Sequence, residues 1–152
     1  MARLKIFTIT QNEDILRQVS KELDPSLLFQ KDWQEFINDF KETMYAADGV
    51  GLAAPQVGKN LRLIAIDIEG EPLVMVNPQI TKKSWLRATA EEGCLSVPKI
   101  YGPVKRHKKI TVKFIDEKGK QQKNIYRDLA ARVIQHEVDH LDGVLFIDKI
   151  SK

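Results

Sequence analysis

The sequence predicts an α+β fold in which mostly antiparallel strands pack around a helix near the C-terminus. Two observations support this prediction. Apolar residues recur with helical spacing near both ends of the chain, and short strand-like runs lie between these regions. Since helices and strands are grouped and do not alternate, a parallel βαβ sheet is not expected. No repeat or flexible linker interrupts the 152 residues, so we expect one domain over residues 1–152.

Two helices are expected in the first third of the chain. A short amphipathic helix is indicated by apolar residues at helical spacing that end before a proline, namely Ile15, Leu16, Val19, Leu23 and Pro25. A second helix over about 32–47 has one apolar stripe, formed by Trp33, Phe36, Ile37, Phe40 and Met44. Asp32 followed by Glu35 is typical of a capping box, and Gly49 is suited to end this helix.

The middle of the chain favours strands. Segment 49–58 contains three glycines and a proline, so we expect neither an ordinary helix nor a strand interior there. Turns are expected at 69–72 and 116–119. Apolar and polar residues alternate in 109–116, as in a half-buried antiparallel strand. The expected strands are 61–67, 73–76, 83–90, 109–116 and 121–126.

A third helix is predicted over 128–141. At 100° per residue, His136, Glu137 and His140 share one side of this helix with Leu129 and Val133. The opposite side carries Asp128, Gln135 and Asp139. We therefore expect both imidazoles and the glutamate to face the interior.

The composition excludes several classes of protein. With 43% hydrophobic and 30% charged residues the chain can bury a core, and its net charge of +3 does not by itself indicate a nucleic-acid or membrane partner. No apolar run approaches the roughly 18–20 residues of a membrane span, and none has signal-peptide length. The single cysteine, Cys94, excludes an internal disulfide. We therefore expect a cytoplasmic protein.

The sequence His136-Glu-Val-Asp-His140 is typical of a metal-binding helix. Imidazoles at i and i+4 lie one above the other, and the glutamate between them can reach a water molecule on the ion. The alternative is a pair of hydrogen-bonded core histidines. This alternative does not explain the inward-facing Glu137, since burying an unpaired carboxylate is costly.

A catalytic site of this type needs a third protein ligand. The long metalloprotease motif has a histidine six residues after the second histidine, but this chain has Phe146 there. Only Asp148 remains as a downstream acid, so the third ligand is expected upstream. Cys94 is the candidate, because thiolate is a strong ligand for a borderline cation and Gly93 permits close backbone approach.

Three segments together resemble the signature motifs of the peptide deformylases. These are Gly-Val-Gly-Leu-Ala-Ala-Pro-Gln (49–56), Glu-Gly-Cys-Leu-Ser (92–96) and Gln-His-Glu-Val-Asp-His-Leu-Asp-Gly (135–143). The resemblance implies an α+β fold with mostly antiparallel sheets packed around the metal-binding helix. It also implies hydrolytic removal of the N-formyl group from the initiator methionine of newly made polypeptides, with release of formate.

The resemblance also implies roles for individual residues. Cys94, His136 and His140 would hold the metal, and Glu137 would act as general base and then as general acid. Gln56 and the backbone N–H of Leu95 would stabilise the oxyanion. The walls of the substrate site would be Val50, Gly51, Glu92, Gly93, Leu129 and Val133. Ligand chemistry alone favours zinc, whereas the resemblance implies iron(II), with nickel or cobalt as further alternatives.

The resemblance implies N-formylmethionyl nascent peptides as partners, and we expect a monomer without a membrane partner. Many bacterial deformylases continue into a C-terminal helix that docks on the ribosome in some members, but this chain ends nine residues after Gly143. The basic segment 105–109 could contact ribosomal RNA transiently instead; a solvated hairpin face is the simpler interpretation.

Two other functions fit parts of the pattern. A metalloprotease shares the helix motif, but Phe146 and the missing downstream ligand argue against it. A binding protein with a structural metal would need a fourth protein ligand, and none is evident. An inactive relative would lack Glu137 or Gln56, and both are present.

Overall fold

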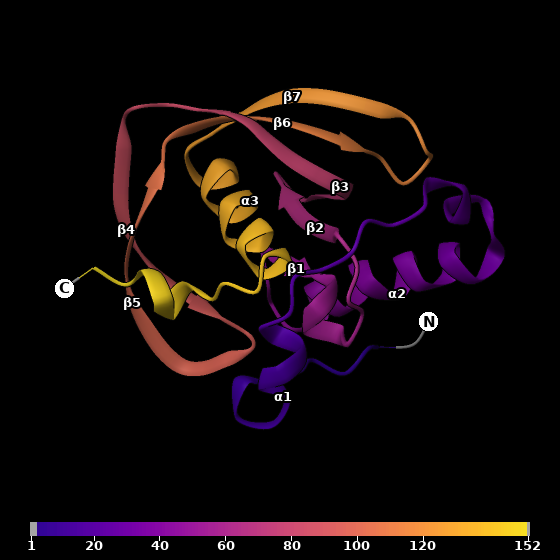
Figure 1. Ribbon diagram of the computed structural model, residues 1–152, viewed down its shortest axis with the longest axis horizontal. Helices are drawn as coiled ribbons and strands as arrows, with labels where there is room; N and C mark the ends of the chain where they lie inside the picture. Colours follow the sequence, from indigo (N-terminus) through magenta and orange to yellow (C-terminus); the bar gives the residue numbers. More distant parts are fainter. Residues whose placement is uncertain (1–2, 152) are drawn as a thin grey trace.

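The computed structural model describes residues 3–151 and confirms the α+β fold (Figure 1). A five-stranded sheet has the order β1-β2-β3-β6-β7, and β4 and β5 form a separate two-stranded sheet. All pairings between these strands are antiparallel. The strands are β1 (Gly51–Ala53), β2 (Leu63–Ile68), β3 (Glu71–Lys83), β4 (Arg87–Cys94), β5 (Val97–His107), β6 (Lys109–Ile115) and β7 (Gln121–Arg127). The α-helices are α1 (Ile9–Leu16), α2 (Lys31–Ala46) and α3 (Asp128–Leu141), with short 3-10 helices at Pro25–Phe29, Ala54–Val57 and Phe146–Lys149.

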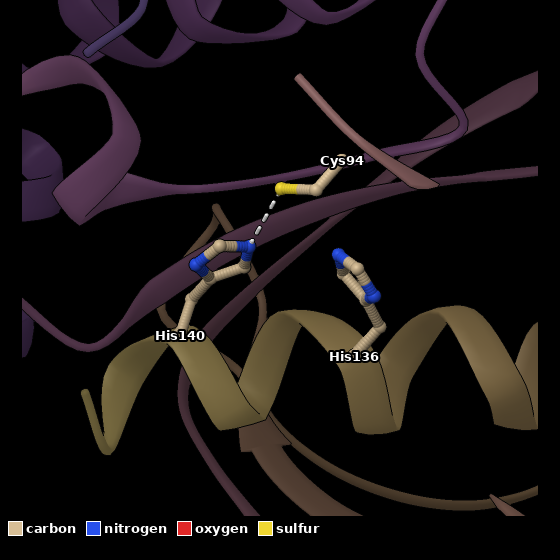
Figure 2. Close-up of side chains that lie close together, drawn as sticks. All are labelled: Cys94, His136 and His140. Carbon is tan, nitrogen blue, oxygen red and sulfur yellow. Dashed lines mark hydrogen bonds between the residues drawn. The ribbon is translucent and has the colours of Figure 1, made fainter. Parts of the chain in front are cut away.

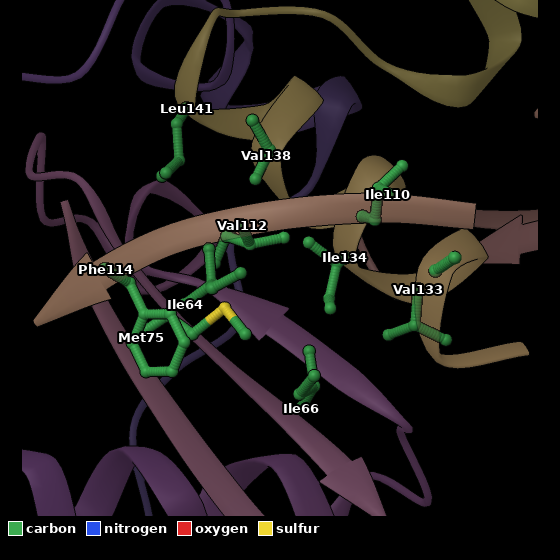
Figure 3. Close-up of a cluster of buried hydrophobic side chains, with 12 residues drawn as sticks. Ile64, Ile66, Met75, Ile110, Val112, Phe114, Val133, Ile134, Val138 and Leu141 are labelled. Carbon is green, nitrogen blue, oxygen red and sulfur yellow. The ribbon is translucent and has the colours of Figure 1, made fainter. Parts of the chain in front are cut away.

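Helix α3 lies at the centre of the molecule because both the large sheet and the β4–β5 hairpin pack around it (Figure 1). Ile134 and Val138 of this helix pack against the apolar side chains of β2, β3 and β6 (Figure 3). Helix α2 contributes Ile37, Phe40 and Met44 to a second cluster on the sheet. The predicted helices over 32–47 and 128–141 are therefore confirmed as α2 and α3.

The start of the chain differs from the sequence prediction. The first helix spans Ile9–Leu16, so the helix expected to begin at Ile15 was wrong. Leu16 is buried, but Val19 is 66% exposed, and the Ser20 N–H donates to the Leu141 carbonyl at 2.7 Å. That bond ties the segment to the end of α3 and prevents a continued helix.

Both ends of α2 also differ from the expected caps. The N-cap residue is Gln30 and makes no side-chain cap bond, so the capping box at Asp32 was wrong. The helix ends at Ala46, and the residue with left-handed backbone is Asp48, with φ of 56°. The Gly49 N–H then donates to the Met44 carbonyl at 2.9 Å and satisfies one free carbonyl of the last turn.

Several strands differ from the expected ones in length or position. Strand β3 continues to Lys83, and residues 84–86 turn the chain into β4, so 83–90 is not a single strand. Strand β5 was not expected, because prolines, a glycine and charged residues obscure its alternation. Within 49–58 the residues of β1 do form a strand, which is fully buried and pairs with β2, contrary to the sequence prediction.

The β4–β5 hairpin is fastened to α3 by a long basic side chain. Arg132 Nη1 donates to the Val104 carbonyl at 2.9 Å, and Nη2 donates to the Ala88 carbonyl at 2.7 Å. Because these carbonyls belong to both strands, the hairpin is held over the helix. Among residues 3–151, no helix is long and apolar enough to cross a membrane.

Candidate metal centre

Three potential metal ligands converge between the end of β4 and the middle of α3 (Figure 2). One ligand atom each from Cys94, His136 and His140 lie within 4.8 Å of one another. The Cys94 Sγ lies 3.3 Å from the His140 Nε2. The two histidines project from successive turns of α3, as their i, i+4 spacing requires. The structure thus contains a Cys/His/His group, with both histidines buried and Cys94 half-buried, that could bind one metal ion.

The ring of His136 is held by Glu92. Its Nδ1 lies 2.9 Å from the Glu92 Oε1, so the other ring nitrogen, Nε2, is directed toward Cys94 (Figure 2). A carboxylate on the outer nitrogen fixes the tautomer and raises the basicity of the inner one, as in many metal sites. Glu92 is therefore a positioning group for His136 as well as part of the cavity wall.

Two arginines hold Glu92 in turn. Arg106 donates from Nε and Nη2 to the two Glu92 oxygens, each at 3.0 Å. Arg132 donates to Glu92 Oε2 at 2.6 Å. Burial alone would raise the pKa of Glu92, but the hydrogen bonds from His136 and Arg106 lower it to about 2. Arg106 also pairs with Asp139, so the two arginines of this network are matched by two carboxylates.

The electrostatics of the group favour a bound cation. Burial and the positive charges of His136 and Arg106 lower the pKa of His140 well below its usual value, which keeps its ring neutral and able to ligate. Burial also opposes the charge on His136, but contacts with Cys94 and Glu92 raise its pKa to about 10. A positive charge is therefore stabilised beside the sulfur, where a metal ion would supply it.

Glu137 lies beside this group and is 5% exposed. Among the described residues no hydrogen-bond partner is found for its Oε1. Burial raises the pKa of this carboxyl to about 7. Its space depends on Gly51, where an added Cβ would lie 2.5 Å from Glu137 Oε2 and 2.7 Å from Val133 Cγ1. Only glycine at position 51 leaves room for the carboxylate next to β1.

The side-chain amide of Gln56 is oriented by the backbone of β1. The Ala53 N–H donates to Gln56 Oε1 at 2.9 Å, which directs Nε2 toward β4. Nε2 lies 3.1 Å from the Ser96 Oγ and 3.5 Å from the Cys94 Sγ. A buried amide donor is thus fixed beside the sulfur, with Leu95 immediately after it in the turn between β4 and β5.

A cavity of about 540 Å³ opens beside these groups, and Gln56, Cys94, Leu95, His136 and Glu137 all line it. The expected wall residues also line it, namely Val50, Gly51, Glu92, Gly93, Leu129 and Val133. Val50 and Leu129 are 51% and 66% exposed, so they form an apolar rim at the mouth. The sequence prediction therefore brought together residues from β1, β4 and α3 that share one cavity.

Several residues that organise the site were not found from the sequence. Segment 105–109 was interpreted as a solvated face, yet Arg106 is only 3% exposed and bonds Glu92. Gln135 was placed on the outer side of α3, but it is buried and its Nε2 donates to the His107 carbonyl at 2.8 Å. The missing signal was β5, whose alternation turns residues 102, 104 and 106 inward.

Comparison with known proteins identifies the family. The family model for polypeptide deformylase matches residues 4–152. A peptide deformylase of Pseudothermotoga lettingae is 53% identical over 114 residues, which are 75% of this chain and 66% of that relative.

Two solved structures are similar over nearly the whole chain. The peptide deformylase of Thermotoga maritima has a TM-score of 0.93 and 39% identity, covering 100% of both chains. A class I type b peptide deformylase of Acinetobacter baumannii, bound to Met-Ala-Ser, has a TM-score of 0.93 and 33% identity over 98% of this chain and 99% of that one. The chain therefore belongs to the polypeptide deformylase family, hydrolases that remove the N-formyl group from newly made polypeptides.

Proposed function

We propose that Cys94, His136 and His140 bind one iron(II) ion, and that this centre removes the formyl group from formylmethionyl peptides. The observation that carries the proposal is the convergence of three ligand atoms within 4.8 Å beside a buried Glu137 oxygen without a partner. One thiolate and two imidazoles suit a borderline divalent cation and leave further positions for water or substrate. Zinc, nickel and cobalt suit the same ligands, so iron(II) rests on the family resemblance.

A divalent cation in such a site lowers the pKa of water from 15.7 to about 7 and polarises a carbonyl oxygen. Glu137 takes a proton from the attacking water and then delivers it to the departing amine, which must leave protonated. Its position suits this role, because the carboxylate lines the cavity and one of its oxygens has no competing hydrogen bond among the described residues.

Gln56 and the backbone N–H of Leu95 stabilise the negative oxygen of the tetrahedral intermediate. The amide of Gln56 suits this role because the Ala53 N–H fixes its direction, so little reorganisation accompanies the reaction. Val50, Gly51, Glu92, Gly93, Leu129 and Val133 form the walls that hold the substrate. A methionine side chain fits a cavity with apolar groups such as Val133 at its wall.

The wider setting follows from the same activity. Residues 1–152 act as one catalytic domain, a monomer in the cytoplasm, where formylated nascent chains are available. A transient contact with the ribosome would bring the cavity to its substrate, and the basic residues of 105–109 apart from Arg106 are exposed enough to take part.

The test is release of formate from formyl-Met-Ala-Ser by protein purified without oxygen and loaded with iron(II). We expect turnover in the native protein and a loss of about a hundredfold or more in Glu137→Gln, since general acid–base catalysis contributes about 10²–10⁴. Glu35→Gln, a side chain 65% exposed on α2, is the matched control and should leave the rate unchanged. Equal rates in native protein and Glu137→Gln would overturn the proposed mechanism.

A further inference from the structure

The outer face of the sheet formed by β3, β6 and β7 is strongly basic. The inner side chains of β6, Ile110, Val112 and Phe114, pack against the core beneath α3. The opposite side of these strands presents five exposed cations, Lys82, Lys109, Lys113, Lys123 and Arg127. We call these five residues the basic face. Their charge exceeds the net charge of +3, so the remainder of the chain is net negative.

Four cations of the basic face lie opposite one another in the pairing of β6 with β7. Lys109 lies directly opposite Arg127, and Lys113 lies directly opposite Lys123. Like charges at directly opposed positions destabilise a sheet. Over residues 3–151, none of the five forms an ion pair with a carboxylate. An external polyanion would relieve this repulsion.

The acidic residues of the neighbouring β6–β7 turn are used elsewhere. Asp116 accepts hydrogen bonds from Gln122 and from backbone N–H groups of the turn. Glu117 pairs with Lys41 of α2 at 3.0 Å. These two carboxylates of the turn therefore do not neutralise the basic face.

An aromatic side chain projects beside the basic face. Trp85 lies in the turn between β3 and β4 and is 95% exposed. This turn is joined to the end of the face, because the Ser84 N–H donates to the Lys109 carbonyl at 2.8 Å and the Lys109 N–H donates to the Ser84 Oγ at 3.1 Å. Ile125, 51% exposed, lies among the cations on β7.

We infer that the basic face and Trp85 bind single-stranded RNA, with the cations on its phosphates and the indole stacked on a base. Charge complementarity favours a polyanion, and an aromatic group beside a basic surface is the arrangement that single-stranded polynucleotides recognise. A face that spans three strands is broader than the helix or two-stranded ribbon that a duplex major groove admits, and extended single strands in cells are mostly RNA. An anionic membrane would require a broader apolar surface than Trp85, Leu86 and Ile125 provide.

The first test is fluorescence anisotropy of a labelled oligouridylate of about 20 nucleotides with the full chain. With five phosphate contacts, the affinity should fall about a hundredfold between about 50 mM and about 200 mM salt. This binding does not depend on the metal centre, so it is expected in metal-free protein and in Glu137→Gln. Absence of binding at the lower salt concentration would overturn the inference.

The second test removes charge from the basic face. Lys82→Gln/Lys113→Gln/Lys123→Gln should weaken RNA binding more than tenfold and reduce its dependence on salt. This variant should release formate at the native rate. Its midpoint of thermal unfolding should stay the same or rise, because repulsion between the cations is removed. The matched control, Lys5→Gln/Lys21→Gln/Lys31→Gln, loses the same charge from exposed positions elsewhere and should bind RNA within about twofold of the native protein.

Trp85→Ala separates stacking from charge. It should weaken RNA binding about fivefold or more without changing the salt dependence, since stacking of a base on an aromatic ring is nearly independent of ionic strength.

Equal loss of RNA binding in both lysine triples would show a general charge effect and contradict the inference. Binding to vesicles of phosphatidylcholine with about 30% phosphatidylglycerol, without binding to RNA, would assign the face to membranes and also contradict it.

Discussion

The β4–β5 and β6–β7 hairpins differ in where their charged side chains lie and in whether those charges are paired. In β4–β5 the inward side chains include Glu92 and Arg106, which are 8% and 3% exposed and bond each other. In β6–β7 the side facing the core is apolar on β6, and the cations lie outside, unpaired within the described chain and opposed to one another. A charge removed from water must be matched by a partner, whereas a solvated charge tolerates mismatch.

This comparison separates residues that support the metal centre from those that serve the surface. The buried charges of the β4–β5 hairpin are paired with one another, and Glu92 in turn holds the ring of His136. The charges of the basic face have no such partners, so their cost is small and their use lies outside the chain. Substitutions in the two hairpins should therefore differ greatly in their effect on stability.

The largest effect on stability is expected from Arg106→Leu. Removal of the guanidinium leaves Glu92 and Asp139 without their shared partner, and breaking such a buried network costs about 3–5 kcal/mol. Urea unfolding of the metal-free variant measures this loss. A free energy of unfolding within about 1 kcal/mol of the native protein, the upper end of what a surface ion pair contributes, would show that this network does not stabilise the fold.

The next effect concerns catalysis. Gln56→Ala removes one fixed donor to the developing oxyanion, so we expect the transition state to lose about 3–4 kcal/mol and turnover to fall by a factor of hundreds. The value of kcat should fall while KM changes little, because the bond strengthens only in the transition state. Unchanged kcat would assign Gln56 a purely structural role through its bond with Ala53.

The smallest effect is expected on the basic face. Lys113→Gln removes a cation directly opposite Lys123, so the free energy of unfolding should stay within about 0.5 kcal/mol or rise slightly. Thermal unfolding measured beside Arg106→Leu checks the contrast between the two hairpins. A loss above 1 kcal/mol, the upper range of exposed pairs, would indicate a stabilising role for Lys113 that the structure does not show.

Much of the fold was predictable because its signals were local. The helical stripe of α2 and the spacing of His136 and His140 on α3 depend only on positions along the chain. The alternation of Ile110, Val112 and Phe114 likewise marked β6. Strand β5 was missed because an arginine occupies an inward position that a periodicity argument assigns to an apolar residue.

The metal ligands could be predicted from the sequence, but the residues that hold them in position could not. Cys94 was inferred because a helix with two imidazoles lacks a third ligand, and the structure brings its sulfur to His140. The roles of Arg106 and Arg132 depend on the packing of a hairpin over α3, which the spacing of residues along the chain does not reveal. Glu92 was expected at the cavity, but its bond to His136 emerged only from the three-dimensional structure.

The most direct measurement is the metal content and ligand set of protein purified without oxygen, by elemental analysis and X-ray absorption at the metal edge, beside Cys94→Ala. We predict one metal atom per chain with one sulfur and two imidazole ligands, and loss of the sulfur signal with most of the metal in the variant. A native protein that binds its metal without sulfur, or a variant that retains full metal content, would contradict the proposed centre.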